Sequence, residues 1–236
     1  GNVLWAKSGG GSNTEEINWV TTDANGNIYV AGSYKSSPLI IGSTTLSNVN
    51  LNQNMFVAKY DNLGNVLWAK SAGNAGNDGA SGVAVDAVGN VFVTGIHQGI
   101  TFGTNVIFNA GATDIFVVKY DTMGNLVWSK GFGGTAADFV SSICTDNAGN
   151  VILAGAFRSP TINFGNITLS SVTFDDIFIT KMDTQGNIIF AKAIGGDGYD
   201  RVNNIVSDHN GNFYVTGDFG STQLSFDTIT ITKFPS

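Results

Sequence analysis

The sequence contains few of the residues that define several large classes of protein. Its single cysteine, Cys144, cannot form a disulfide within the chain, and the apolar–polar run around it favours a buried free thiol. No stretch approaches the roughly 18 apolar residues of a membrane-spanning helix, and the start lacks the basic and apolar regions of a signal peptide. We therefore predict no membrane insertion, and expect any secretion signal to have been removed or to lie outside these residues.

Basic residues are also scarce, because the formal net charge is -7. Nucleic acids and anionic membrane surfaces attract basic patches, so neither is an expected partner. The two histidines, His97 and His209, are far apart in sequence, and neither has a cysteine or carboxylate recurring beside it at a metal-ligand spacing. Catalytic motifs such as G-x-S-x-G and H-E-x-x-H are missing as well. We predict that the chain is not an enzyme.

Thirty-one glycines and an internal repeat dominate what is present. The segment GNVLWAK begins at Gly1 and again at Gly64, and it returns as GNLVWSK at Gly124 and as GNIIFAK at Gly186. A second series, DANGNIYVAG, DAVGNVFVTG, DNAGNVILAG and DHNGNFYVTG, recurs in the same phase. The chain therefore consists of four repeat units, with approximate bounds 1–63, 64–123, 124–185 and 186–236.

Each unit contains D-x-x-G-N motifs that predict tight β-hairpin turns. The aspartate accepts a bond from the backbone two residues on, and the glycine supplies the positive φ required before the next strand. Runs with strand propensity flank the motifs, so we expect four strands per unit, in the second unit at 82–86, 90–95, 115–120 and 125–130. The pattern ITFGTNVIF in that unit predicts a short outer hairpin between the second and third strands.

Tandem four-stranded antiparallel units predict an all-β fold, a β-propeller with four blades of about 60 residues. Seven of the nine lysines recur in the hairpin of the third and fourth strands, where we expect them to protect the outermost strands from edge-to-edge association. A large aromatic residue recurs at one position of the fourth strand, and we expect it to pack between blades: Trp5, Trp68, Trp128 and Phe190.

The patterns DxxGNxYVAG and FVAKYDxxGNVLWAK resemble the SBBP-type β-propeller repeats of bacterial extracellular proteins. The resemblance covers the whole chain in four copies, and it is specific for the fold. It implies a location outside the cell or on the bacterial surface, within a larger protein, and a binding or structural role. The family offers no shared catalytic residues to carry over to this chain.

The last residues, FDTITITKFPS from Phe226 to Ser236, allow two alignments. In the first, LSFDTITI matches the outer-hairpin pattern INFGNITL, so the third strand of the fourth blade is missing. In the second, FDTITITKF matches FDDIFITKM from Phe174, and Ser236 meets Gly1 to close a four-bladed ring. The second alignment loses the outer hairpin although its pattern persists. We favour the first and expect part of a larger propeller, with the closed four-bladed ring as the alternative.

An acidic residue stands eight positions before the first turn aspartate of each unit, at Glu15, Asp78, Asp138 and Asp200. In a propeller these carboxylates would surround one face near the channel, where oxygen ligands can hold a hard cation such as Ca²⁺. The alternative is that each carboxylate caps a connection by accepting backbone N–H bonds. We favour the caps, keep the metal site as the second hypothesis, and expect no other cofactor.

Three hypotheses for the function follow. The first is a non-catalytic scaffold that binds or adheres to a protein or glycan through variable blade connections, chiefly 9–16 and 72–80. The second is a structural spacer in a larger secreted protein. The third is an enzyme acting on polysaccharide at the channel, because four carboxylates have no assigned role: Asp175, Asp176, Asp197 and Asp218. We favour the first hypothesis.

Overall fold

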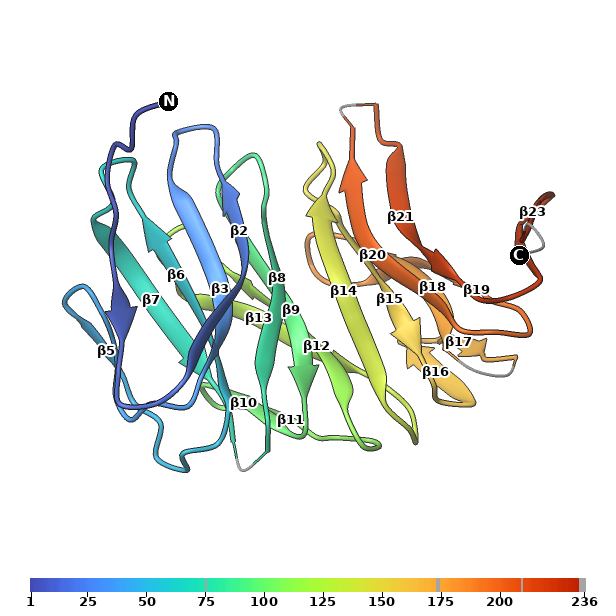
Figure 1. The fold of residues 1–236 in the computed structure, drawn as a ribbon, viewed down its shortest axis with the longest axis horizontal. Helices are drawn as coiled ribbons and strands as arrows, with labels where there is room; N and C mark the ends of the chain where they lie inside the picture. The colour runs from blue at the N-terminus through green and yellow to red at the C-terminus, as the bar shows by residue number, and fades with distance from the viewer. Residues whose placement is uncertain (75, 173–174, 209, 234–236) are drawn as a thin grey trace. The chain divides into compact units, whose positions relative to one another are not determined.

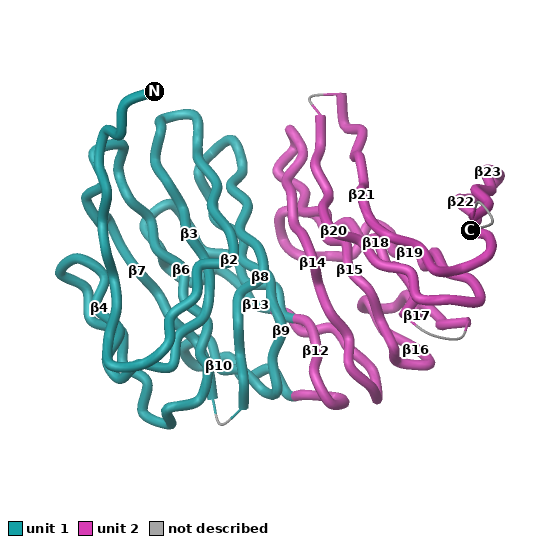
Figure 2. Tube along the Cα trace, in the orientation of Figure 1, with its two compact units in different colours: residues 1–108, 116–129 teal, residues 109–115, 130–236 magenta. Residues whose placement is uncertain are grey.

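The computed structural model describes residues 1–74, 76–172, 175–208 and 210–233, and within them every regular element is a β-strand (Figure 1). His209 and the tail from Phe234 to Ser236 lie outside the described residues. The chain divides into two compact units (Figure 2), and the division passes through the strands Asp114–Tyr120 and Leu126–Phe132. Unit 1 comprises Gly1–Phe108 and Phe116–Ser129, and unit 2 comprises Asn109–Ile115 and Lys130–Ser236.

The first two sheets are each four-stranded and antiparallel, as predicted, and each takes its fourth strand from the start of the following repeat. The strands of the first sheet, in order, are β2 (Glu15–Thr22), β3 (Ile28–Tyr34), β6 (Asn54–Tyr60) and β7 (Val66–Ala72). Those of the second are β8 (Gly79–Val85), β9 (Val91–His97), β12 (Asp114–Tyr120) and β13 (Leu126–Phe132). The outer hairpins are β4 (Leu39–Ile41) with β5 (Thr44–Leu46), which β1 (Gly9–Gly10) joins, and β10 (Ile100–Phe102) with β11 (Asn105–Ile107).

Unit 2 contains a third sheet with the same strand order and a shorter fourth sheet. The third sheet consists of β14 (Asp138–Thr145), β15 (Val151–Phe157), β18 (Asp176–Met182) and β19 (Ile188–Ile194), with the outer hairpin β16 (Thr161–Phe164) and β17 (Ile167–Ser170). The fourth pairs β20 (Asp200–Ser207) with β21 (Phe213–Phe219). We name the strands of each sheet A to D in chain order and each sheet with its outer hairpin a blade. These are the blades of a β-propeller.

The D-x-x-G-N turns adopt the predicted hairpin geometry. The glycine has a positive φ in seven copies: Gly26, Gly64, Gly89, Gly124, Gly149, Gly186 and Gly211. At Asp61, Oδ1 accepts bonds from the backbone N–H of Leu63 (2.9 Å) and of Asn65 (2.8 Å). The Asn65 side chain donates to Oδ2 at 2.8 Å, and this bond is the first reason why the pKa of the exposed Asp61 is lowered. The asparagine of the motif thus stabilises the turn through its bonds to the aspartate, a role that was not predicted from the sequence pattern.

The strands β22 (Gln223–Phe226) and β23 (Ile229–Thr232) support the first alignment of the chain end. They pair with each other, Phe226 opposite Ile229, as Phe164 pairs with Ile167 in the third blade. Asp227 has φ +52° where the third blade has Gly165 at φ +61°. This segment is therefore the outer hairpin of the fourth blade, and among the described residues β21 pairs only with β20.

The expectation for the lysines was wrong for strand C. Strand C lies between strands B and D in each complete sheet, so its lysine is not at an edge. Lys59 and Lys119 are buried, with Nζ over the rings of Tyr29 (5.2 Å) and Phe92 (5.1 Å) respectively. Only the strand D lysines stand on an outer strand, where the predicted protection still applies.

Two of the four aromatics, Trp68 and Phe190, pack against the neighbouring blade as predicted, whereas Trp128 lies beside Phe92 of its own blade, with ring centroids 6.1 Å apart. Trp68 of the first blade lies beside Tyr120 of the second, with ring centroids 6.2 Å apart, and its Nε1 donates to the Thr122 carbonyl at 3.3 Å. Phe190 of the third blade stacks on Phe213 of the fourth, with centroids 6.2 Å apart. In these two pairs, each within one compact unit, a blade therefore buries apolar surface against the next one along the chain.

Candidate binding face at the blade connections

The four carboxylates Glu15, Asp78, Asp138 and Asp200, here the rim carboxylates, mark the junction between each D-to-A connection and strand A. The three aspartates are fully buried. Asp138 accepts bonds from the backbone N–H of Gly134 (2.8 Å), Arg158 (3.1 Å) and Ser159 (3.1 Å), and from the Ser159 hydroxyl (2.8 Å). One carboxylate thus ties the connection before strand A to the residues that follow strand B.

Other rim carboxylates make equivalent bonds. Asp200 accepts bonds from the backbone N–H of Gly220 and Ser221 and from the Ser221 hydroxyl, and Glu15 accepts a bond from the Ser36 hydroxyl. In the part of the chain that the structure describes, no three metal-ligating side chains gather around a common point. The bonds therefore support the capping role for these residues, and the Ca²⁺ site stays a hypothesis.

Asp78 accepts fewer hydrogen bonds than the other two buried rim carboxylates, Asp138 and Asp200. The second blade has Gly99 where the others have Ser36, Ser159 and Ser221. The donors to Asp78 are the backbone N–H groups of Asn74 (2.9 Å) and Gln98 (3.1 Å). Burial consequently raises its pKa to about 6.

The free energy of unfolding is expected to fall by about 2 kcal/mol between pH 4.5 and pH 7.5 through Asp78. Its pKa is about 6 in the folded chain and near the ordinary value when unfolded, so the folded state binds more protons in this window. Stability is then highest below the unfolded pKa and declines as pH rises through the folded one. Urea unfolding across this range measures the slope, and Asp78→Asn should flatten it. A slope unchanged by that substitution would contradict the assignment.

A second repeated position, the first residue of strand C, carries Asn54, Asp114 and Asp176. Their Oδ1 atoms are buried and have no hydrogen-bond partner among the described residues. Each lies against the glycine after strand D, where a Cβ would overlap the side chain: Gly73, Gly133 and Gly195. Burial raises the pKa of Asp114 and Asp176, and the carboxylates of Asp138 and Asp200 raise them further. Asp114 was not among the predicted site residues, although the run D-I-F recurs at the start of strand C in the second and third blades.

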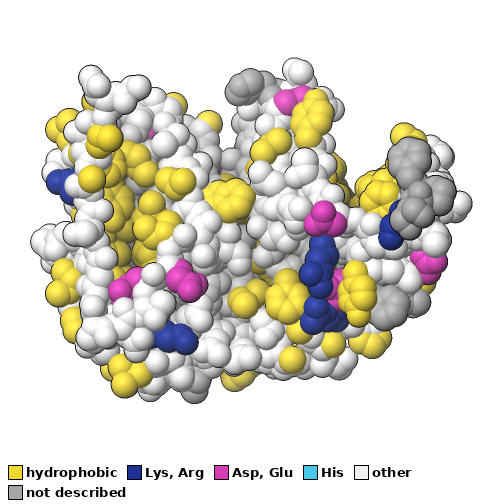
Figure 3. All heavy atoms as spheres, in the orientation of Figure 1, with side chains coloured by type: hydrophobic (Ala, Val, Ile, Leu, Met, Phe, Trp, Pro, Cys, Tyr) yellow, Lys and Arg dark blue, Asp and Glu magenta, His cyan; other side chains and the backbone are white. Residues whose placement is uncertain are grey.

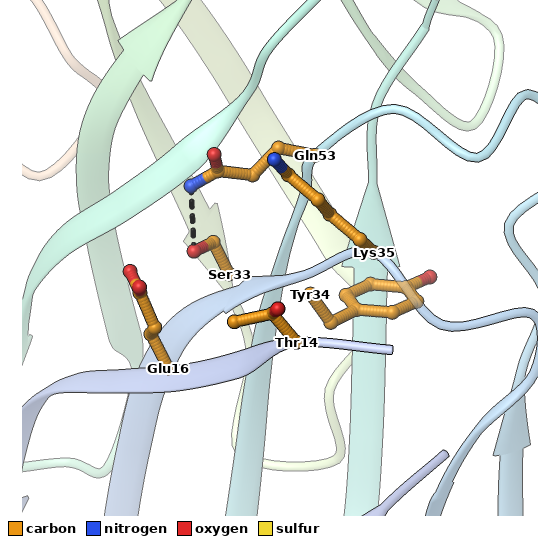
Figure 4. A pocket seen from close by; sticks show the side chains of 6 residues that line it. All are labelled: Thr14, Glu16, Ser33, Tyr34, Lys35 and Gln53. Atoms are coloured by element: carbon orange, nitrogen blue, oxygen red, sulfur yellow. Dashed lines mark hydrogen bonds between the residues drawn. The ribbon is translucent and has the colours of Figure 1, made fainter. Parts of the chain in front are cut away.

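The residues that neighbour the rim carboxylates and the first residue of strand C differ from blade to blade. In the first blade they line a cavity of about 70 Å³, in which Gln53 Nε2 donates to Ser33 Oγ at 2.7 Å (Figure 4). Glu16 and Lys35 extend from strand A and from the end of strand B into the same cavity. In the third blade Phe139, Arg158 and Asp175 take the places of Glu16, Lys35 and Gln53.

The four carboxylates considered for glycoside chemistry have separate surroundings. Asp175 pairs with two arginines, and Asp176 accepts the backbone N–H of Val172 at 2.7 Å. Asp197 accepts both the N–H and the hydroxyl of Thr222, and Asp218 accepts the side chain of Asn203 at 3.2 Å. Each thus has a neighbour that accounts for its presence without a reaction.

No protein-family model matches the chain. It is 27% identical over 192 residues to an uncharacterized WD repeat-containing protein, L264, of Acanthamoeba polyphaga mimivirus, covering 68% of this chain and 14% of that protein. It is 26% identical over 222 residues to the regulatory protein FlaEY of Caulobacter vibrioides, covering 89% of this chain and 23% of that protein. The chain thus spans less than a quarter of the length of either relative. The WD-repeat relative agrees with the β-propeller fold.

Proposed function

We propose that this chain is a non-catalytic β-propeller module that binds protein partners through the blade connections beside the rim carboxylates, here the binding face of each blade. The observation that carries the proposal is the contrast within one repeat. The turns, the rim carboxylates and the glycines after strand D recur in the blades. The neighbouring positions differ, from Glu16 and Lys35 in the first blade to Phe139 and Arg158 in the third. A rigid frame with varied side chains is the usual arrangement of a binding surface on repeats.

The location and the ligand class are finer parts of the proposal. We place the module outside the cell or on a bacterial surface, and the resemblance to SBBP-type repeats supports this placement. We assign the connections 9–16 and 72–80 to the same binding role, and a glycan is the alternative ligand there. Among the described residues no helix is long and apolar enough to cross a membrane. A spacer that binds nothing and an enzyme acting on polysaccharide are the competing functions.

Cross-linking of the purified chain to extracts of its source, followed by mass spectrometry, tests the proposal. We expect cross-links from Lys35, and we expect a variant with Glu16, Lys35 and Gln53 all changed to alanine to lose the partner captured in the first blade. The matched control is Lys70→Ala on strand D, which should retain it. Partners that map to strand D, or none at all, would contradict the proposal, and binding on a glycan array without a protein partner would favour the glycan.

A further inference from the structure

The only two arginines of the chain, Arg158 and Arg201, meet at one carboxylate in unit 2. Arg158 donates from Nε to Oδ1 of Asp175 and from Nη2 to Oδ2, the latter at 3.2 Å. Arg201 donates from Nε (3.0 Å) and Nη2 (2.8 Å) to Oδ2. The Asp175 side chain is 3% exposed, whereas those of Arg158 and Arg201 are 45% and 53% exposed. The buried carboxylate of Asp175 therefore holds two guanidinium groups that remain about half exposed to solvent.

Each of the two guanidinium groups also lies over an aromatic ring. Arg158 lies over the ring of Phe139 at 5.3 Å, and Arg201 lies over the ring of Tyr199 at 5.9 Å. Stacking and the bonds to Asp175 reduce the side-chain entropy that a ligand would otherwise have to remove. Figure 3 shows Lys and Arg side chains in one strip, flanked by hydrophobic side chains, on the unit 2 part of the visible face. The two arginines are thus pre-organised donors.

The fold itself does not require this cluster. At the positions of Arg158, Asp175 and Arg201, the junction between the first two blades has Lys35, Gln53 and Gly79. In the sequence, the positions that match the two arginines and Asp175 one repeat earlier are Gln98, Thr113 and Phe139. Both sets occur within the same hydrogen-bonded frame of strands. A purely structural role for two arginines and an aspartate is therefore a weaker explanation than a ligand.

The charge of the cluster indicates the kind of ligand. Burial opposes ionisation of Asp175, but the two guanidinium groups hold its pKa below the ordinary value, so it stays charged. Two cations and one anion leave a local charge of about +1, which a single carboxylate neutralises. Both guanidinium groups bind Asp175 through Nε and Nη2, so the edge that carries Nη1 is turned away from Asp175. The N–H groups of such an edge can donate to the oxygens of a carboxylate. The net charge of -7 repels polyanions.

We propose that Arg158 and Arg201, held by Asp175, bind one exposed aspartate or glutamate side chain of a protein partner. The inference rests on the proposed function, because it names the chemistry by which the binding face recognises that partner. The ligand carboxylate lies between the two guanidinium groups and accepts bonds from their outer edges. Tyr199, which is 54% exposed, supplies apolar contact beside it.

Selective ¹⁵N-arginine labelling tests this directly, because the chain then gives one Nε–H signal for each of its two arginines. The probe is acetyl-glutamate amide, added at constant ionic strength. We expect a saturable shift of both signals, and none with acetyl-glutamine amide. Arg158→Gln, which copies Gln98, should weaken the response of the Arg201 signal about tenfold. Lys35→Gln, at the matching position of the first blade, should leave both responses unchanged.

Three results would overturn the inference: silent arginine signals, an equal shift with sodium chloride, or a stronger response to methyl phosphate. Its failure is also separable from that of the proposed function. The variant Arg158→Gln, Asp175→Thr and Arg201→Phe installs the set already present at the matching positions one repeat earlier. If a partner is captured at the binding face and this variant retains it, the scaffold function stands and the carboxylate site does not. Loss of that partner at an unchanged melting temperature supports both.

Discussion

Replacing Asp138 by alanine is expected to lower the free energy of unfolding by about 3–5 kcal/mol. The substitution leaves the backbone N–H groups of Gly134 and Ser159 and the Ser159 hydroxyl without this acceptor in a fully buried site, while the Arg158 N–H keeps only its bond to the Ala137 carbonyl at 3.2 Å. The penalty of a buried donor without an acceptor exceeds the net gain of the bond itself, so the loss is much larger than for an exposed aspartate. Urea unfolding near pH 7 measures it.

Two variants make that result specific to the cap. Asp138→Asn keeps one acceptor oxygen and should recover part of the loss, because some of the four donors regain a partner. Asp197→Ala removes an exposed carboxylate that binds Thr222, and we expect a much smaller change. If Asp138→Ala and Asp197→Ala were equally stable, the rim carboxylates would not hold the connections, and the metal hypothesis would gain weight.

The sequence was sufficient to predict the blades because their determinants are local. Each turn needs an aspartate, a glycine with positive φ and an asparagine within five consecutive residues, and Gly64 and Gly124 fulfil the prediction at φ +78° and +77°. The outer hairpins follow for the same reason: in β22–β23, Asp227 takes the left-handed position that glycine takes elsewhere. Local patterns of this kind need no knowledge of long-range contacts.

The cluster of Arg158, Asp175 and Arg201 could not be predicted from the sequence because these residues lie far apart along the chain. Arg158 and Asp175 are separated by 17 positions, and Asp175 and Arg201 by 26. Arg158 and Asp175 stand at the two ends of the connection between β15 and β18, and Arg201 is the second residue of β20. Only the pairing of β15 with β18 and the packing of the next blade bring the three together. The spacing of the rim carboxylates was visible, but the serines that bind them follow 21 positions later and vary in the second blade.

Substituting alanine for Gly155 is expected to destabilise the chain by about 2–4 kcal/mol. This glycine lies in strand B opposite a β-bulge between Val140 and Ser142 of strand A. A Cβ there would overlap the Phe139 carbonyl oxygen and lie 2.7 Å from the Phe178 ring. The carbonyl belongs to a paired strand and the ring is fully buried, so neither can move without breaking other contacts.

The same argument applies to every blade, because Gly32, Gly95 and Gly217 face equivalent bulges and equally close carbonyl oxygens. Gly79→Ala is the matched control, since other blades hold Phe139 or Arg201 at that position and a Cβ would first meet the flexible Gln53 side chain, at 3.3 Å. Urea unfolding should separate the two substitutions by at least about 1 kcal/mol. Equal stabilities would mean that strand A relaxes around a side chain at the bulge. The recurrent glycine would then not be needed to position the rim carboxylate at the start of strand A.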